Sequence, residues 1–491
     1  MPAHTDSVDR RTTDALFTLV LGVYALMLAG ATTAVTGASA ACPTLPACDG
    51  LTFEEGISAL VIVVLSHRVL ALIVGLGLLW LTWHVRGDSV AKGVRRPIIA
   101  AVTLYPVQVA VGALAVGADT SVSVSGAHLV VAVAIFGALT VALARQLTDV
   151  SDESDIPNAG VFDRHDGVEA EMAGDDLSIS AAEPGSARGP SASSKSTRMG
   201  VRSLFPGRSW EYLRMTKPRL MWLLCLVALA AMLLAGGRTV PMDRIAWTLL
   251  GGVLAVGASG VFNNVLERDV DEQMNRTADR PLVEQRVSVR RATAFGIVLA
   301  FASLGVLAAR VNLLAALLGL LAILSYSVGY TILLKPNTTQ NIVIGGAVGA
   351  FPALIGWSAV RGSIGFEILL LSVVIFLWTP AHFYNLALMY KEEYATAGFP
   401  MLPVVRGEET TRRHIVLYLA ATMVAVAFLG ALTALDWLFA VSAVVAGAVF
   451  LWFVVRLCRR KTDRAARNAF VSANAYLGVL LVAIVVDSIF V

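Results

Sequence analysis

Three oxygen-bearing side chains recur at intervals of four residues in the middle of the chain: Asn263, Glu267 and Asp271. On a helix this spacing places them on one face. Two carboxylates and an amide oxygen can hold Mg²⁺, a hard ion that prefers oxygen ligands and also bridges to substrate phosphates. The arginines in the same stretch suit a diphosphate, because guanidinium groups pair bidentately with phosphate oxygens.

The composition places this stretch in a membrane protein. Hydrophobic residues make up 57% of the 491 residues and charged residues 15%, whereas a soluble domain is about 45–50% apolar and about 25% charged. The apolar residues gather in long blocks, which excludes a soluble enzyme, a disordered protein and a disulfide scaffold. The net charge is only +3 and no basic cluster is large, so no nucleic-acid partner is expected.

Thirteen blocks are long enough to cross a bilayer, and they predict an all-α polytopic membrane protein. Residues 1–148 hold four predicted spans, which are Ala15–Ala40, Ile57–Trp83, Pro97–Val116 and Val124–Ala144. Residues 209–491 hold nine, which are Leu220–Ala235, Ile245–Val261, Ala292–Ala309, Leu313–Leu333, Ile342–Val360, Ile368–Leu388, Ile415–Leu432, Trp437–Val455 and Phe470–Val491. Residues 149–208 are acidic and then rich in Gly, Ser and Pro, which predicts a disordered linker.

Arginine and lysine gather after the second, sixth, tenth and twelfth predicted spans. Basic loops stay in the cytoplasm, so we expect a cytoplasmic N-terminus and a C-terminus outside the cell membrane. The stretch 263–280 then lies on the cytoplasmic side. A second acidic pair, Glu392 and Glu393, falls on the same side.

Taken alone, the stretch 263–280 also fits a solvated turn with alternating charges. The second acidic pair on the same side favours a metal–diphosphate site instead. The chemistry of such a site is departure of diphosphate from an allylic substrate, with Mg²⁺ and basic residues stabilising the leaving group. The carbocation left behind needs an apolar, water-poor pocket, which a helix bundle provides.

The second part of the chain, from about Tyr212 to Val491, resembles the intramembrane aromatic prenyltransferases, which are nine-helix proteins with two Asp-rich loops. Finer motifs resemble their haem O synthase branch. These motifs are Thr216–Arg219, Asn264–Asp271, Met274–Thr277, Leu334–Lys335, Asn341–Gly346, Trp378–Phe383 and Ala397–Pro403. The resemblance implies transfer of the farnesyl group of farnesyl diphosphate to a vinyl group of protohaem IX (haem b), giving haem O.

The resemblance also implies roles for individual residues. Mg²⁺ and the diphosphate would be held by oxygen ligands from both loops, namely Asn263, Glu267, Asp271, Glu392 and Glu393. Basic side chains would bind diphosphate oxygens, namely Arg268, Arg280 and Lys335. Glu267 and Glu393 stand where the family commonly has Asp, and Pro336 replaces a usual basic residue. His382 is expected to bind or orient the haem substrate, although a lone helical histidine is more often structural.

The first unit carries His67 and His128 on neighbouring predicted spans at similar depth. A histidine within the bilayer is costly without a partner, and two such residues could ligate one haem iron. By spacing alone, a pair of hydrogen-bonded structural histidines is equally consistent.

Residues 16–144 resemble one four-helix half of haem A synthase, through Val35–Ser39, Cys42–Gly50, Ser66–Arg68, Gln108, Gly112 and His128. That resemblance implies a bound haem in the first unit, a Cys42–Cys48 disulfide and a haem A synthase as partner. Val64 stands where the related enzymes often have Glu, so we expect haem binding or docking in preference to full haem A synthesis.

Other functions stay open from sequence. They are a bifunctional enzyme making haem O and haem A, a prenyltransferase for a quinone-type acceptor, and a haem carrier or transporter. The motifs Asn341–Gly346 and Pro400–Pro403 disfavour the quinone acceptor. The absence of a convincing internal repeat disfavours the transporter.

Overall fold

The structure is a computed structural model that describes residues 2–38, 42, 59–87, 93–117, 122–148, 207–433 and 435–490. Almost all of the predicted linker 149–208, and Cys48 in the predicted disulfide loop, lie outside the described residues. Helices account for nearly all of the described chain, and no strand occurs in it.

The first unit consists of four long helices, which are α1 (Pro2–Val35), α2 (Ala59–Gly87), α3 (Arg95–Gly117) and α4 (Val122–Leu147). The second unit begins with α5 (Gly207–Met215), α6 (Pro218–Gly236), η4 (Gly237–Thr239), α7 (Met242–Leu266), α8 (Arg268–Asp271), α9 (Val289–Arg310), α10 (Leu313–Leu324) and η5 (Ser325–Leu334). It continues with α11 (Asn341–Gly345), η6 (Gly346–Ala350), α12 (Phe351–Arg361), α13 (Phe366–Met389), α14 (Lys391–Thr396), α15 (Leu402–Val405), α16 (Gly407–Leu432), α17 (Trp437–Arg460) and α18 (Asp463–Phe490).

Thirteen helices in the described residues are long and apolar enough to cross a membrane, and each coincides with one predicted span. The prediction of an all-α, multi-pass membrane protein is therefore confirmed. The observed helices run further than predicted at charged ends. For example, α16 starts at Gly407 and not at Ile415. Its first turns are charged and so lie outside the apolar block, but Arg412 pairs with Glu408 at 2.5 Å and with Glu409 at 3.1 Å, four and three residues away on the same helix.

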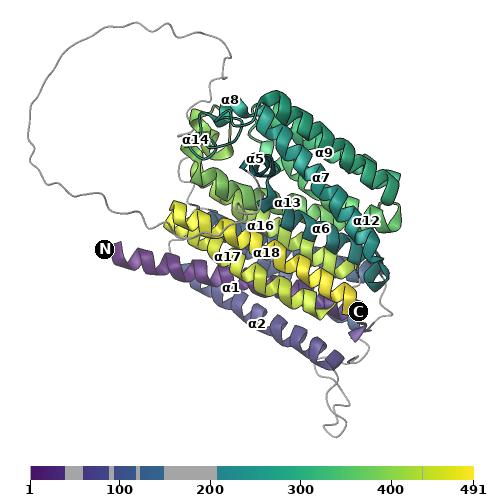
Figure 1. The fold of residues 1–491 in the computed structure, drawn as a ribbon. Helices are drawn as coiled ribbons and strands as arrows, with labels where there is room; N and C mark the ends of the chain where they lie inside the picture. Colours follow the sequence, from purple (N-terminus) through teal and green to yellow (C-terminus); the bar gives the residue numbers. More distant parts are fainter. Residues whose placement is uncertain are drawn as a thin grey trace, which may run out of the picture.

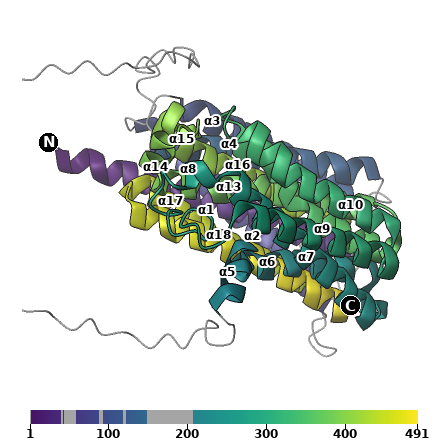
Figure 2. The same ribbon diagram turned by 45° about the horizontal axis from the view of Figure 1, so that its top comes forward.

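The short helices α8 and α14 lie side by side at one end of the bundle in both views (Figures 1 and 2). The long helices alternate in direction, so that α7 and α13 both finish at this end while α9 and α16 start there. The N-terminal part of α1 lies at the same end, and the C-terminus lies at the opposite one (Figure 1). Both candidate loops are therefore on one face of the bundle.

The described parts of the two units share one hydrophobic core. Helix α1 packs along α16 and α17, and α4 also contacts α16. Gly447 of α17 lets the ring of Tyr24 approach within 3.2 Å of where a Cβ would stand. At the end of the bundle, Arg459 pairs with Asp14 at 2.6 Å. The first unit is thus packed against the second through α1, and the described chain does not consist of two separate bundles.

Candidate active site

The three oxygen ligands predicted on one helix face lie at a break between two helices. Helix α7 ends at Leu266 and α8 begins at Arg268, because Glu267 leaves helical geometry with φ −97° and ψ 6°. The backbone still bonds from Glu267 N to Asn263 O at 3.0 Å and from Asp271 N to Glu267 O at 2.7 Å. These bonds keep the four-residue register, so Asn263, Glu267 and Asp271 remain together and buried.

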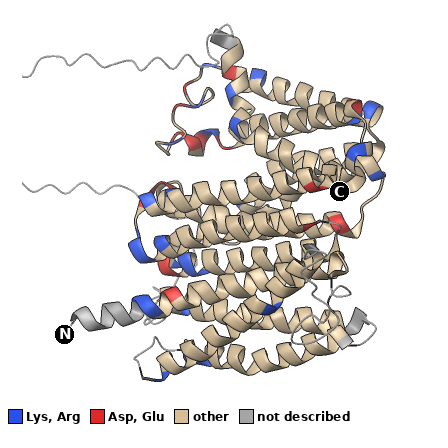
Figure 3. Ribbon diagram, turned by 90° about the horizontal axis from the view of Figure 1, so that it is seen from below, with Lys and Arg blue, Asp and Glu red and all other residues tan. Residues whose placement is uncertain are grey.

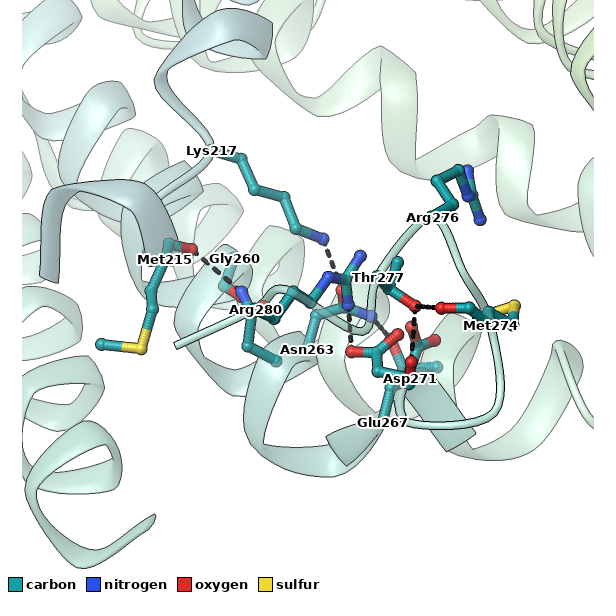
Figure 4. A network of polar contacts seen from close by, with 12 residues as sticks. Met215, Lys217, Gly260, Asn263, Glu267, Asp271, Met274, Arg276, Thr277 and Arg280 are labelled. Atoms are coloured by element: carbon teal, nitrogen blue, oxygen red, sulfur yellow. Dashed lines mark hydrogen bonds and ion pairs between the residues drawn. The ribbon is translucent and has the colours of Figure 1, made fainter. Parts of the chain in front are cut away.

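A cation from a different part of the chain contacts each of these three side chains. Lys335, just after η5, donates to Glu267 Oε1 at 2.6 Å. Arg280 pairs with Asp271 Oδ2, and Lys217 donates to Asn263 Oδ1. Figure 4 shows Lys217 and Arg280 reaching towards the end of α7. The predicted diphosphate-binding residues Arg280 and Lys335 are therefore brought directly to the predicted metal ligands.

Burial dominates the electrostatics of this network. It raises the pKa of Asp271, against the opposing effect of Arg280. Burial lowers the pKa of Lys335, with Glu267 acting in the opposite direction. For Lys217, burial and the nearby Arg280 lower the pKa to about 8. Charged groups are held here at a cost in solvation that their partners offset only in part.

One carboxylate oxygen of the network has no partner among the described residues. Asp271 Oδ1 is buried and accepts no hydrogen bond from them, whereas the buried polar atoms of proteins are nearly always paired. A hard cation beside Asp271 would satisfy this oxygen and would find further oxygen ligands on Glu267 and Asn263. The described residues contain no group of three or more His, Cys, Asp and Glu side chains that could hold a metal. The set thus fits an ion that takes its remaining ligands from water and phosphate.

One member of the second acidic pair, Glu393, lies against the loop that follows α8. Glu393 Oε2 accepts from the backbone N of Arg276 at 3.3 Å. The Arg276 guanidinium lies over the rings of Tyr390 and Tyr394 and donates to the Tyr394 hydroxyl at 3.2 Å. Glu393 thus joins α14 to the first loop, whereas Glu392 is exposed.

Arg268 is not part of the buried network. Its guanidinium pairs with the neighbouring Asp269 at 2.6 Å, and both side chains are largely exposed. The sequence alone does not distinguish Arg268 from Arg280, but of the two only Arg280 pairs with a carboxylate of the buried network.

His382 is enclosed by aromatic side chains between α13 and α18. Its ring stacks on Trp378 with centroids 4.5 Å apart and on Phe470 at 4.2 Å. Trp378 also donates to the carbonyl of Ala473 at 2.9 Å, which ties the same two helices together. His382 Nδ1 is buried and accepts or donates no hydrogen bond within the described residues. That nitrogen is the atom through which His382 could contact a substrate.

In the first unit, His67 of α2 and His128 of α4 each keep a buried Nδ1 that has no hydrogen-bond partner in the part of the unit that the structure describes. The other nitrogen of His128 lies 3.1 Å from Gln108 Nε2. Glycines face both rings: a Cβ at Gly30 of α1 would stand 3.4 Å from His67, and one at Gly112 of α3 would stand 2.8 Å from His128. All four helices therefore contribute to the space around the two imidazoles.

Next to this space, Arg68 donates to the carbonyl of Cys42 at 2.9 Å. Cys42 is disulfide-bonded, and the other predicted partner, Cys48, lies outside the described residues. Pairing of these two cysteines remains a prediction.

Sequence reasoning did not assign Lys217 to the site. Its backbone is left-handed, with φ 57°, at the turn between α5 and α6, and its ammonium also donates to the Tyr326 hydroxyl at 3.3 Å. The only signal was its place in the motif Thr216–Arg219. The contact of Tyr326 with Lys217 and that of Tyr394 with Arg276 were not predicted, although Tyr394 directly follows the predicted ligand Glu393.

Comparison with known proteins identifies the class to which this fold and site belong. The model of the UbiA prenyltransferase family matches residues 224–478, more than half of the chain. The model of a cytochrome oxidase assembly protein family, COX15-CtaA, matches residues 2–140. This protein, a multi-helix membrane bundle with buried carboxylates and cations at one end, is therefore an intramembrane prenyltransferase.

Two similar relatives carry the name Protoheme IX farnesyltransferase. The one from Haloarcula marismortui is 48% identical over 98% of this chain and 99% of its own length. The one from Halobacterium salinarum strain NRC-1 is 46% identical over 96% of this chain and 100% of its own. The chain belongs to the protoheme IX farnesyltransferases within the UbiA prenyltransferase family.

Solved structures with a similar fold include two described as UbiA homologs. One, from Archaeoglobus fulgidus and bound to DMAPP and Mg²⁺, is 19% identical, with a TM-score of 0.45 over 56% of this chain and 99% of its own. The other, from Aeropyrum pernix K1 without ligand, is 20% identical, with a TM-score of 0.47 over 54% of this chain and 97% of its own.

Proposed function

We propose that the chain transfers the farnesyl group of farnesyl diphosphate to a vinyl group of haem b and so makes haem O. The observation that carries this proposal is the buried network in which Lys217, Arg280 and Lys335 contact Asn263, Asp271 and Glu267. Family membership supplies the acceptor, since the relatives are named for protoheme IX.

In the proposed reaction the bond between C1 of the farnesyl group and the diphosphate oxygen breaks, and the electron pair leaves with the diphosphate. Arg280 and Lys335 would move from carboxylate partners, and Lys217 from the amide oxygen of Asn263, to phosphate oxygens, which carry the growing charge. Asn263, Glu267 and Asp271, with the second pair Glu392 and Glu393, would hold Mg²⁺, which would supply positive charge beside the same oxygens. The vinyl carbon attacks the allylic cation, and water quenches the new cation with loss of a proton.

The tightly packed interior supports this chemistry because a carbocation must be shielded from water until the vinyl group attacks. We place the haem acceptor near His382, whose Nδ1 is the unpartnered polar atom in an otherwise aromatic enclosure. Arg268 would assist the diphosphate only after leaving Asp269.

The test is to incubate membranes with haem b, farnesyl diphosphate and Mg²⁺ and to identify the haem product by its mass. Wild type should form haem O, and Asp271→Asn should form almost none. Asp269→Asn is the matched control, since Asp269 is exposed and pairs with Arg268 outside the buried network. Failure of wild type to make haem O, or undiminished product from Asp271→Asn, would contradict the proposal. A prenylated quinone or haem A as product would favour the alternative acceptor or the bifunctional enzyme.

We further propose three segments: residues 1–148 as a haem A synthase-like unit, 149–208 as a linker, and 209–491 as the prenyltransferase. We assign the chain to the cell membrane, with the N-terminus and the active-site loops cytoplasmic and the C-terminus outside. The position of α1's start and both acidic loops at one end of the bundle supports this orientation.

For the first unit we propose a bound haem between His67 and His128. The two imidazole nitrogens that have no hydrogen-bond partner in the described residues support this proposal, because a haem iron takes imidazole nitrogens as axial ligands. With such a haem site, the unit would receive haem from a haem A synthase or pass haem to it. Loss of the bound-haem spectrum in His67→Ala and His128→Ala tests it, and a spectrum that survives both changes together would contradict it.

A further inference from the structure

A cavity of about 570 Å³ lies where the first unit meets the second, between the start of α1 and the end of α17. Arg10, Asp14 and Phe17 recur on one face of α1, and Trp452, Val455, Arg456 and Arg459 on one face of α17. This arrangement is a groove between two membrane helices. It lies at the same end of the bundle as the active-site loops but is formed by other residues.

The groove has an apolar part and a basic part. The apolar part is lined by Phe17, Trp452 and Val455, and the basic part by Arg10, Arg456, Arg459 and Arg460. Trp452 is 47% exposed and lies beneath the guanidinium of Arg456, with 5.4 Å between the Arg456 carbon and the ring centroid. Arg456 and Arg460 follow at the end of α17, where the helix leaves the membrane. Figure 3 shows arginine and lysine gathered at the helix ends on the side where α1 begins.

The basic charge of the groove is only partly balanced. Asp14 is the single acidic residue in the lining, and it pairs with Arg459 at 2.6 Å. Arg10, Arg456 and Arg460 form no ion pair with an acidic side chain in the described part of the chain. A basic pocket between transmembrane helices on one membrane face, with an apolar wall below it, suits an amphiphile with an anionic head group.

We propose that this groove binds an anionic phospholipid, with its phosphodiester on Arg10, Arg456 and Arg460 and an acyl chain along Phe17 and Trp452. Because Arg10 belongs to the first unit and the other two arginines to the second, the lipid would bridge the two units. Farnesyl diphosphate is the other phosphate-bearing amphiphile in this system. We favour the phospholipid because the groove lies between two candidate membrane spans and shares no residue with the active site.

The test is native mass spectrometry of the full chain in neutral detergent, titrated with phosphatidylglycerol or with phosphatidylcholine. We expect wild type to retain phosphatidylglycerol in preference. The double change Arg456→Gln with Arg460→Gln should weaken that binding by about tenfold or more, because each arginine near an anionic lipid contributes to the attraction. The matched control is Arg290→Gln with Arg291→Gln, which removes two exposed arginines at the start of α9, at the same end of the bundle.

Three results would overturn the proposal. They are equal binding of the two lipids, equal loss in the groove variant and the control, and displacement of phosphatidylglycerol from wild type by farnesyl diphosphate. Arg456→Lys with Arg460→Lys guards against misfolding, because it keeps the charge and should keep most of the binding. Retained farnesyl transfer by the Gln variant in detergent would show in addition that the active site is intact.

Discussion

The ammonium of Lys335 lies 2.6 Å from Glu267 Oε1, and both side chains are more than nine-tenths buried. This pair joins the break between α7 and α8 to the end of η5. Two elements from distant parts of the chain therefore meet through a buried ion pair at the site.

Lys335→Met should destabilise the protein strongly, because it leaves the Glu267 carboxylate buried without its cation. Breaking a buried pair from one side costs about 3–5 kcal/mol. Adding Glu267→Gln should recover much of the loss, since neither charge then remains. Thermal unfolding of the two variants in detergent measures this. A double variant no more stable than Lys335→Met would show that the pair is not the main contact of Glu267.

Lys217 should make the reaction sensitive to alkaline pH. Its pKa is lowered to about 8, so its positive charge is present below that pH and is lost as the pH rises through it. If the ammonium binds diphosphate, kcat/KM for farnesyl diphosphate should fall above about pH 8. Lys217→Arg keeps a charge at all these pH values and should extend the plateau upwards. The same alkaline limb in wild type and Lys217→Arg would assign the titration to another group.

Arg280 and Arg268 should differ sharply in their importance. Arg280→Gln removes the partner of a buried carboxylate and a proposed diphosphate ligand, so product formation should drop by about 10²–10³-fold. Arg268→Gln changes an exposed pair and should alter the rate by less than about threefold. Steady-state rates with saturating haem compare the two. Similar losses would mean that Arg268 leaves Asp269 and enters the site during turnover.

His382→Phe separates packing from substrate contact. The new ring should keep the stack between Trp378 and Phe470, so the unfolding temperature should change little. If Nδ1 contacts the haem, KM for haem should rise by about three- to tenfold, the value of one hydrogen bond. KM for farnesyl diphosphate should stay the same. An unchanged KM for haem would leave His382 with a packing role alone.

Much of the fold could be predicted from the sequence, because apolar blocks of about 20 residues have few alternatives to a membrane helix. The thirteen spans follow from the length and hydropathy of these blocks. The arrangement of the helices cannot be predicted in this way, because a helix face that packs on α16 and a helix face that meets lipid are equally apolar. Contact of α1 with α16 and α17 could not have been found in this way.

The site was predictable where its residues are close in sequence. The spacing of Asn263, Glu267 and Asp271 survives the break at Glu267 because the backbone bonds continue through it. Lys217 lies 46 residues before Asn263 and arrives through a left-handed turn that no periodic pattern encodes. The choice between Arg268 and Arg280 depends on how the loop after α8 folds back, which composition does not specify.

The packing of α1 against α16 and α17 has a consequence for how the two units stay together. Their association depends on a shared hydrophobic core and the Asp14–Arg459 pair, and not on a continuous backbone between residues 148 and 207. A chain cut in that interval, or made as two polypeptides, should co-purify as a single complex. The covalent connection then guarantees equal numbers of the two units, whereas non-covalent packing determines their geometry.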